Sequence, residues 1–348
     1  MGRCEELPYE VELDLAVRSL RGTSAKRIVL QLPDGLKKFG ADIARCLEEA
    51  LEEAEVFVHA DSVYGSCDLQ YGQLLATLRP DAIVHVGHSP YPAEIAHEGL
   101  EPRGVRVIYV PALSKLRVTK EAVRGAGELL RSHGAREVAV VTTAQHTHMV
   151  REIRQQLEEE GLRAVVPRGL QPFFSDGQVI GCDYRVARGV KADAYLYFGG
   201  GVFHPLGLYL ATFRPVVKLD PYENRATDLT PLGERTYRIR LLKVAESFQV
   251  ERWGIFVGVK TGQYRPWLVK LLAEEMRRRG KKYLLMSSEN LTLQNLMAVD
   301  NEWFQAFSVT SCPRIPTDDH WEYEKPVLTP GETIMALRGE LEPYRFPW

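Results

Sequence analysis

The chain has 348 residues, of which 45% are hydrophobic and 26% charged, and its 46 acidic and 44 basic residues give a net charge of −2. These proportions are typical of soluble globular proteins and exclude a disordered, collagen-like or coiled-coil chain. The balanced charge gives no overall attraction for nucleic acid. The sequence contains no run of about 18 apolar residues, which is the length needed to cross a membrane. Residues 1–10 lack a secretory signal pattern, so we expect a cytoplasmic protein with no membrane partner and no direct nucleic-acid contact.

The predicted helices and strands occur in three similar runs. Each run begins with an amphipathic helix, continues with a short apolar segment typical of a buried parallel strand, and then adds a helix and two further strands. The first run comprises residues 10–20, 27–32, 39–53, 55–59 and 82–86. The second comprises residues 120–132, 137–142, 148–160, 163–166 and 194–198. The third comprises residues 237–246, 253–258, 266–279, 282–286 and 304–309.

The spacing of these runs is regular. The apolar parts of the first strands begin at Ile28, Val138 and Ile255, which are 110 and 117 residues apart. Alternating strands and helices favour parallel sheets with right-handed crossovers. We therefore predict three homologous parallel-sheet α/β units, arranged with pseudo-threefold symmetry around a central site: residues 1–115, 116–233 and 234–348.

The chain contains five cysteines, at Cys4, Cys46, Cys67, Cys182 and Cys312. An odd number without a secretory signal argues against a disulfide framework. Cys46 lies in an apolar helical stretch, so we expect a thiol of the core. Cys4 lies close to the start of the chain, and we expect it to have no role.

The other three cysteines lie in loops that follow predicted strands, one in each unit. They occur in the sequences Gly-Ser-Cys67-Asp, Ile-Gly-Cys182-Asp and Thr-Ser-Cys312-Pro. Ligand sites of open parallel sheets form beyond the carboxyl ends of the strands, so three such loops could converge. For each cysteine taken alone, a buried structural thiol is the alternative.

Three converging thiolates are suited to metal chemistry. A structural zinc site takes four protein ligands, often in paired CxxC spacing, and no CxxC occurs here. A catalytic zinc with three ligands stays open, because nine histidines are present. An iron–sulfur cluster is favoured, since thiolates are its usual ligands and three of them leave one of four irons for a substrate or cofactor.

Four stretches of the chain resemble a known family. They are residues 30–35 (Leu-Gln-Leu-Pro-Asp-Gly), 64–68 (Tyr-Gly-Ser-Cys-Asp), 199–201 (Gly-Gly-Gly) and 309–319 (Val-Thr-Ser-Cys-Pro-Arg-Ile-Pro-Thr-Asp-Asp). Together with the length, the triplication and one loop cysteine in each unit, they are similar to the archaeal 2-(3-amino-3-carboxypropyl)histidine synthases. That family catalyses the first step of diphthamide biosynthesis.

The resemblance implies a homodimeric radical S-adenosylmethionine enzyme. It implies that Cys67, Cys182 and Cys312 hold a [4Fe–4S] cluster, with S-adenosylmethionine bound at the unique iron. Cleavage between sulfur and the aminocarboxypropyl Cγ would then place that group on C2 of a histidine of translation elongation factor 2 and release methylthioadenosine. A reductant protein of unknown identity is expected as a further partner.

Four other residues are candidates for binding S-adenosylmethionine. Gly199, Gly200 and Gly201 permit close backbone approach to a ligand, although a plain turn is the alternative. Arg314 could bind the methionyl carboxylate through both of its guanidinium nitrogens, or it could pair with Asp318 or Asp319.

No catalytic residue is assigned. Several histidines lie near predicted strand ends, where any of them could move a proton from the substrate imidazole or be structural: His85, His88, His146, His148 and His204. Asp34 is expected to cap the helix that follows it.

Three alternative functions stay open. The first is a three-cysteine [4Fe–4S] enzyme acting on a small molecule, as quinolinate synthase and hydroxymethylbutenyl diphosphate reductase do. The second is a non-catalytic partner subunit with the same fold. The third is a zinc-dependent hydrolase.

Overall fold

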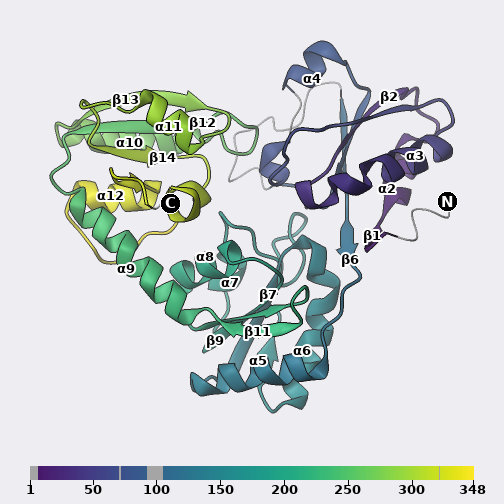
Figure 1. The fold of residues 1–348 in the computed structure, drawn as a ribbon, viewed down its shortest axis with the longest axis horizontal. Helices are drawn as coiled ribbons and strands as arrows, with labels where there is room; N and C mark the ends of the chain where they lie inside the picture. The colour runs from purple at the N-terminus through teal and green to yellow at the C-terminus, as the bar shows by residue number, and fades with distance from the viewer. Residues whose placement is uncertain (1–6, 70–71, 92–104, 321) are drawn as a thin grey trace.

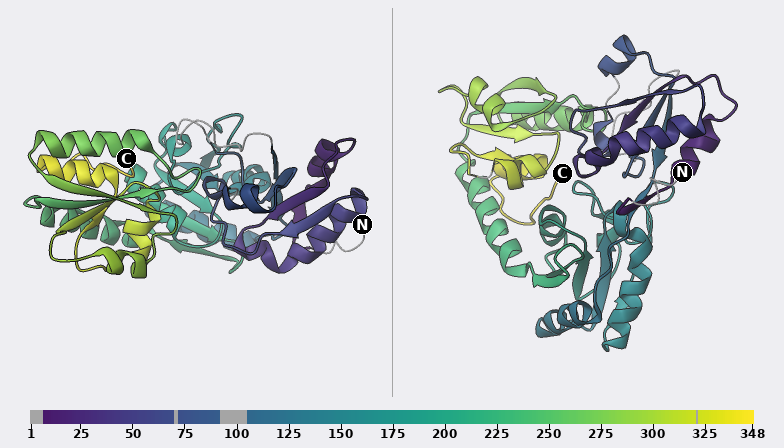
Figure 2. Two further views of the ribbon diagram at one scale, coloured as in Figure 1. Left: turned by 90° about the horizontal axis from the view of Figure 1, so that it is seen from above. Right: turned by 45° about the vertical axis from the view of Figure 1, so that its right-hand side comes forward.

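The computed structural model describes residues 7–69, 72–91, 105–320 and 322–348. Three α/β units surround a common centre, the first at upper right in Figure 1, the second below and the third at upper left. Seen from above, the units lie side by side in one layer (Figure 2). No helix in the described ranges is long and apolar enough to span a bilayer.

Each unit is built on its own sheet, and the three sheets share one strand order. In the first unit the order is β3 (Glu55–Val58), β2 (Arg27–Gln31), β4 (Ala82–Val86) and β5 (Arg106–Val110), all parallel. The second unit repeats it with β8 (Arg163–Val165), β7 (Glu137–Thr142), β9 (Ala194–Phe198) and β10 (Val216–Asp220), and adds the antiparallel β11 (Arg225–Asp228). The third has β13 (Lys282–Ser288), β12 (Arg252–Gly258), β14 (Ala306–Val309) and β15 (Val327–Leu328). This order confirms the predicted parallel α/β architecture, whereas pseudo-threefold symmetry stays a prediction.

One hydrogen-bond device recurs in all three units. The residue directly before each third strand accepts from two successive backbone N–H groups at the start of the first strand. Asp81 accepts from residues 26 and 27, Asp193 from residues 136 and 137, and Gln305 from residues 251 and 252. The same local solution at three equivalent positions supports the interpretation that the units are copies of one unit.

Helices cover the sheets and join the units (Figure 1). The first unit carries α2 (Leu13–Leu20), α3 (Gly40–Ala50) and α4 (Gly72–Thr77), and a small sheet pairs β1 (Tyr9–Val11) with β6 (Ala112–Ser114). The second carries α5 (Lys120–Ser132), α6 (Val150–Glu159), α7 (Arg185–Arg188) and α8 (Phe203–Thr212). The third carries α10 (Pro266–Arg278), α11 (Leu293–Val299) and α12 (Pro330–Arg338). Helix α9 (Thr230–Glu246) spans the predicted junction at residues 233–234 and connects the second unit to the third.

Three helices begin later than predicted. Helix α2 begins at Leu13 and not at residue 10, because residues 9–11 form strand β1, and short 3₁₀ turns precede the other two. Residues 34–39 form a 3₁₀ helix before α3, and residues 144–149 form another before α6. Asp34 is the first residue of the earlier turn, and no side-chain cap hydrogen bond is present there, so its predicted role as a helix cap is wrong. Its carboxylate instead pairs with Lys37 at 2.7 Å and accepts from Ser62.

The hydrophobic core divides the molecule unequally. One buried cluster combines side chains of the second and third units, including Tyr197, Trp253 and Met335. The main buried cluster of the first unit draws only on residues 7–112. Among the described residues, the first unit is therefore attached to the others by small clusters and polar contacts at its loops.

A buried ion pair joins α9 to α12 within the third unit. Arg240 donates to Glu332 through Nε at 2.9 Å and Nη2 at 2.6 Å, and both side chains are almost fully buried. The Tyr344 hydroxyl donates to the same carboxylate at 2.6 Å. Removal of one partner leaves a buried charge without its counter-ion.

We therefore predict that Arg240→Gln lowers the free energy of unfolding of the third unit by about 3–5 kcal/mol. Urea unfolding measures the loss. The matched control is Arg154→Gln, which removes an exposed pair with Glu158 and should cost only about 0.3–0.5 kcal/mol. Equal losses in the two variants would contradict this account.

Candidate functional site

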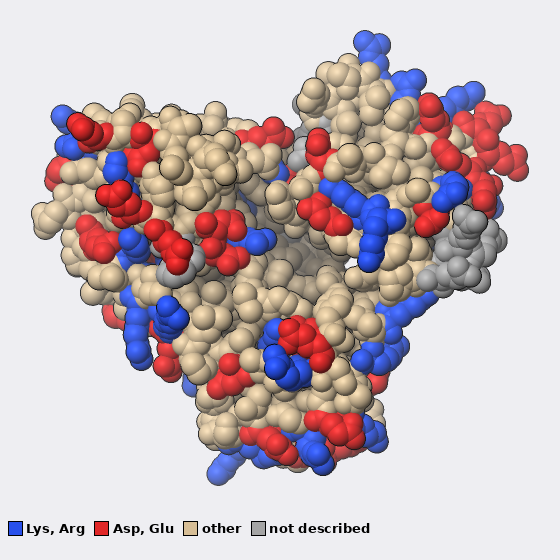
Figure 3. All heavy atoms as spheres, in the orientation of Figure 1, with Lys and Arg blue, Asp and Glu red and all other residues tan. Residues whose placement is uncertain are grey.

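Three thiols, one from each unit, come together where the units meet. Cys67 lies in a 3₁₀ turn (Ser66–Asp68) after β3, Cys182 lies in a loop between β8 and α7, and Cys312 follows β14. All three are free and partly buried. Cys67 and Cys182 both pack against Tyr91, and Cys312 lies close enough to both to interact electrostatically. The surface is hollowed between the three units (Figure 3). The predicted convergence of the three loops is thus present.

Burial and mutual repulsion oppose ionisation of these thiols. Burial, followed by the neighbouring Cys182 and Cys312, raises the pKa of the Cys67 thiol. Burial and Cys182 raise the pKa of Cys312 to about 11. At neutral pH the unliganded thiols are therefore protonated, and a group that binds thiolates must displace three protons.

The loop after β12 holds the Cys67 turn in place. The Gly262 N–H donates to the Cys67 carbonyl at 2.8 Å, and the Thr261 hydroxyl donates to the Leu69 carbonyl at 2.9 Å. The Gln263 side-chain amide lies 3.8 Å from the Cys67 sulfur. A Cβ on residue 262 would lie 2.5 Å from the Cys67 Cα, so only glycine allows this approach.

A buried ion pair strengthens the same contact between the first and third units. Lys260 Nζ lies 2.6 Å from Asp68 Oδ2, and both side chains are at most 3% exposed. Lys260 also lies over the ring of Tyr64 at 4.7 Å. Because Asp68 directly follows Cys67, the pair places the thiol relative to the third unit.

Arg265, at the end of the same loop, connects the other two cysteine loops. Its Nη2 donates to the Tyr91 hydroxyl at 2.7 Å, and that hydroxyl lies 3.4 Å from the Cys182 sulfur. Its Nη1 donates to the carbonyls of Thr310 and Ser311, just before Cys312. One side chain is thus bound to the surroundings of two thiols.

A further polar contact joins the first and second units. The Gln178 Nε2 donates to the Ser89 hydroxyl at 2.8 Å, and the Gln178 Oε1 accepts from the Ser175 N–H. Near Cys182, Asp183 accepts from the Arg185 backbone N–H and from its guanidinium. These bonds orient the loop that carries Cys182.

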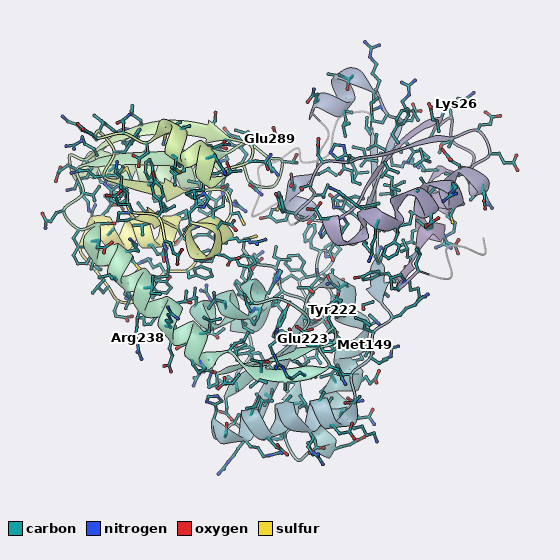
Figure 4. All side chains as sticks on the ribbon, in the orientation of Figure 1. Lys26, Met149, Tyr222, Glu223, Arg238 and Glu289 are labelled. Carbon is teal, nitrogen blue, oxygen red and sulfur yellow. The ribbon has the colours of Figure 1, made fainter. Side chains whose placement is uncertain are left out.

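The predicted glycine stretch lies directly after β9. Gly199 has φ of 150° and Gly201 has φ of 73°, conformations that side-chain-bearing residues rarely adopt. A Cβ on Gly200 would lie 3.0 Å from the ring of Tyr222. Tyr222 lies on the side of the second unit that faces the other two units (Figure 4). Binding of a cofactor by these glycines stays a prediction.

Arg314 forms ion pairs with Asp318 and Asp319, the predicted alternative to ligand binding. Its Nε lies 3.0 Å from Asp318 and 3.4 Å from Asp319, and its guanidinium lies 5.9 Å from the ring of Phe203. The side chain is 48% exposed, so it can still reach a ligand. Its role in binding S-adenosylmethionine stays a prediction.

The candidate histidines are neutral at pH 7. Burial lowers the pKa of His88, His146 and His204 to about 4, and burial also lowers the pKa of His85 and His148. His85 bonds to Gln31 through Nδ1 at 3.1 Å and to His88 through Nε2 at 3.0 Å. Burial thus makes each of them a weaker base, and none is singled out as catalytic.

One cysteine differs from its predicted state. Cys46 is disulfide-bonded, so the expectation of a free core thiol is wrong. An odd number of cysteines excludes complete pairing but allows one or two disulfides. Cys4 lies outside the described residues.

Several residues around the thiols were not among the predicted site residues: Asp68, Tyr91, Lys260, Gln263 and Arg265. Lysine, glutamine and arginine surround a glycine in residues 260–265, directly after a buried strand. That pattern, at the carboxyl end of a first strand, was the available signal.

The donor set fits an iron–sulfur cluster. Within the described ranges, no group of three or more His, Cys, Asp or Glu side chains is arranged to hold a single metal ion. In a four-iron cluster, each thiolate binds a different iron. Three free thiols of uniform type are the donor set that such a cluster takes.

Comparisons with known proteins identify the family. The family model described as "Putative diphthamide synthesis protein" matches residues 32–345. The 2-(3-amino-3-carboxypropyl)histidine synthase of Pyrococcus horikoshii is 33% identical, covering 96% of this chain and 93% of the relative. Subunit 1 of the human synthase is 29% identical, covering 95% of this chain and 72% of the relative.

Solved structures agree with the sequence comparisons. Dph2 from Pyrococcus horikoshii matches with a TM-score of 0.82 at 33% identity, covering 97% of this chain and 93% of that one. The same protein with a 4Fe–4S cluster matches with a TM-score of 0.80 at 32% identity, covering 97% and 92%. The resemblance found in the sequence is confirmed: the chain belongs to the diphthamide synthesis protein family and is an enzyme of the transferase class.

Proposed function

We propose that this enzyme transfers the 3-amino-3-carboxypropyl group of S-adenosylmethionine to C2 of a histidine on translation elongation factor 2. The observation that carries the proposal is the convergence of one free thiol from each unit, in a chain of the diphthamide synthesis family. The cluster in the structure of the Pyrococcus relative supports it.

The proposed ligands of a [4Fe–4S] cluster are Cys67, Cys182 and Cys312. When bound and reduced, the cluster supplies the electron that cleaves the bond between sulfur and Cγ of S-adenosylmethionine, with methylthioadenosine as the second product. Gly262 and the Lys260–Asp68 pair fix the Cys67 turn. Burial at the junction limits the access of water to the thiols.

The proposed residues for S-adenosylmethionine are Gly199, Gly200, Gly201 and Arg314. The glycines leave room for a ligand against the backbone. Arg314 lies two residues after Cys312 and carries a positive charge suited to the methionyl carboxylate. After the transferred group adds to C2, the imidazole must lose one proton and one electron; one of the candidate histidines would take up the proton, and the electron would return to the oxidised cluster.

The proposed partners are elongation factor 2 as protein substrate and a separate reductant protein. We propose a homodimer, as the family resemblance implies, and a cytoplasmic site of action because the substrate works in translation. The role of a non-catalytic subunit is less favoured, since every unit contributes a free thiol. The small-molecule and zinc-hydrolase alternatives have no specific feature of the described residues in their favour.

We predict that the purified, reduced enzyme alone modifies elongation factor 2. Anaerobic incubation with S-adenosylmethionine and dithionite should add one aminocarboxypropyl group to the factor, measured by mass spectrometry, and release methylthioadenosine. A catalytic chain needs no further subunit. Absence of both products, with a loaded and reduced cluster, would refute the proposed activity.

We predict that Cys67→Ala, Cys182→Ala and Cys312→Ala each greatly reduce bound iron, because each removes one of three ligands. Iron and sulfide analysis after anaerobic reconstitution measures the loss. Cys46→Ala is the matched control and should keep the wild-type iron content. Equal iron loss in the control would show that the three loop cysteines have no special role.

We also predict that Gly262→Ala reduces iron retention without changing a ligand. The added Cβ would collide with the backbone of Cys67 and displace its turn. Gly125→Ala is the control, because nothing lies within 4 Å of a Cβ on that residue of α5. Resistance of bound iron to a chelator is the measurement, and equal resistance in the two variants would contradict the role of this contact.

A further inference from the structure

Arg265 is a buried cation whose partners are all uncharged. The side chain is 1% exposed. Its guanidinium donates to the Tyr91 hydroxyl and to the carbonyls of Gln263, Thr310 and Ser311. It also lies 4.4 Å from the ring of Trp348. In the described part of the chain no carboxylate pairs with it, and its buried Nε has no acceptor.

This situation is unusual for a buried arginine. Removing a charge from water is costly, so buried ions are normally paired or bind a ligand. Arg240 in the same unit is equally buried and follows this rule, because Glu332 binds it through two hydrogen bonds. Arg265, by contrast, bonds to no carboxylate among the described residues.

Arg265 is held beside the cysteines. Its Nη2 donates to the Tyr91 hydroxyl, which lies 3.4 Å from the Cys182 sulfur, and its Nη1 donates to the carbonyl of Ser311, directly before Cys312. The proposed cluster would therefore place negative charge next to this cation.

We propose that Arg265 is the internal counter-ion of the cluster and favours its reduced state. The inference rests on the proposed function, because it requires a cluster on the three cysteines. Reduction moves one electron from an external reductant to the cluster, with no bond made or broken. The reduced, more negative state is stabilised more by a fixed cation than the oxidised state is, so the cation raises the reduction potential.

Tyr91 links Arg265 to the sulfur of Cys182 and should also raise the reduction potential of the cluster. Its oxygen accepts from Arg265, which leaves its own O–H to donate to Cys182, 3.4 Å away. A hydrogen bond to a ligand sulfur is one of the features that set the potential of iron–sulfur clusters. Tyr91 is thus a positioning residue between the guanidinium and the cluster ligand.

The test compares variants of the two residues with matched controls. Arg265→Gln removes the charge, Arg265→Lys keeps the charge but loses the planar fork, and Tyr91→Phe removes only the hydroxyl. Arg252→Gln is the arginine control, because Arg252 also donates to backbone carbonyls but at the opposite end of β12. Tyr195→Phe is the tyrosine control, because its hydroxyl bonds to the Ala187 carbonyl.

The measurement is the midpoint potential of the cluster, determined by anaerobic redox titration followed by electron paramagnetic resonance. We expect Arg265→Gln to reduce the ratio of reduced to oxidised cluster at least tenfold at a fixed ambient potential, which is a fall of about 59 mV for one electron. The midpoint potential of Tyr91→Phe should fall by less. The midpoint potential of Arg265→Lys should lie between those of Arg265→Gln and the wild type, and both controls should have the wild-type potential.

Two results would overturn the inference while leaving the proposed function intact. One is an unchanged potential in Arg265→Gln with a full cluster. The other result matters if Arg265→Gln does not retain iron. In that case, an unchanged midpoint potential in Tyr91→Phe, which keeps the arginine, would overturn the inference. A wild-type chain that binds no cluster would instead overturn the proposed function together with this inference.

Discussion

The position of the candidate site depends on the contact between the loop after β12 and the Cys67 turn. Gly262 approaches the Cys67 backbone so closely that a methyl group would not fit, and the Lys260–Asp68 pair is buried beside it. The first unit shares no large hydrophobic cluster with the third among the described residues. Hydrogen bonds and a buried ion pair, and not a broad apolar interface, therefore fix the position of Cys67 relative to the other two cysteines.

A shared core of two units, with the first unit attached by polar contacts, suits a site to which all three units contribute. The second and third units share one core, which gives Cys182 and Cys312 a common rigid support. Buried thiols resist ionisation, and their mutual repulsion would push the loops apart once they became thiolates. Arg265 counters both tendencies, because it supplies positive charge and also bonds to Tyr91 and to the carbonyl before Cys312. One side chain thus couples the electrostatics of the site to its geometry.

Much of this architecture could be predicted from the sequence. The first and third strands of each unit are apolar runs flanked by polar residues, and their positions follow directly from that pattern. Cys67, Cys182 and Cys312 could be singled out because each lies in a loop and not inside an apolar run, where core cysteines usually lie. The fourth strands were missed: β15 has only two residues, and β10 contains Lys218 and Asp220, whose charges are buried as a pair at 2.9 Å. Tyr91 was missed because its role comes from a contact with Arg265, which lies in another unit and 174 residues away in the chain, and no local pattern reveals such a contact.

The central claim is that three units contribute one thiol each to a single iron–sulfur cluster. Iron, sulfide and zinc analysis of the anaerobically reconstituted wild-type chain, together with its visible absorption spectrum, tests this claim most directly. The account predicts about four irons and four sulfides per chain, with absorption that dithionite bleaches. Stoichiometric zinc, or no bound metal after reconstitution, would contradict it.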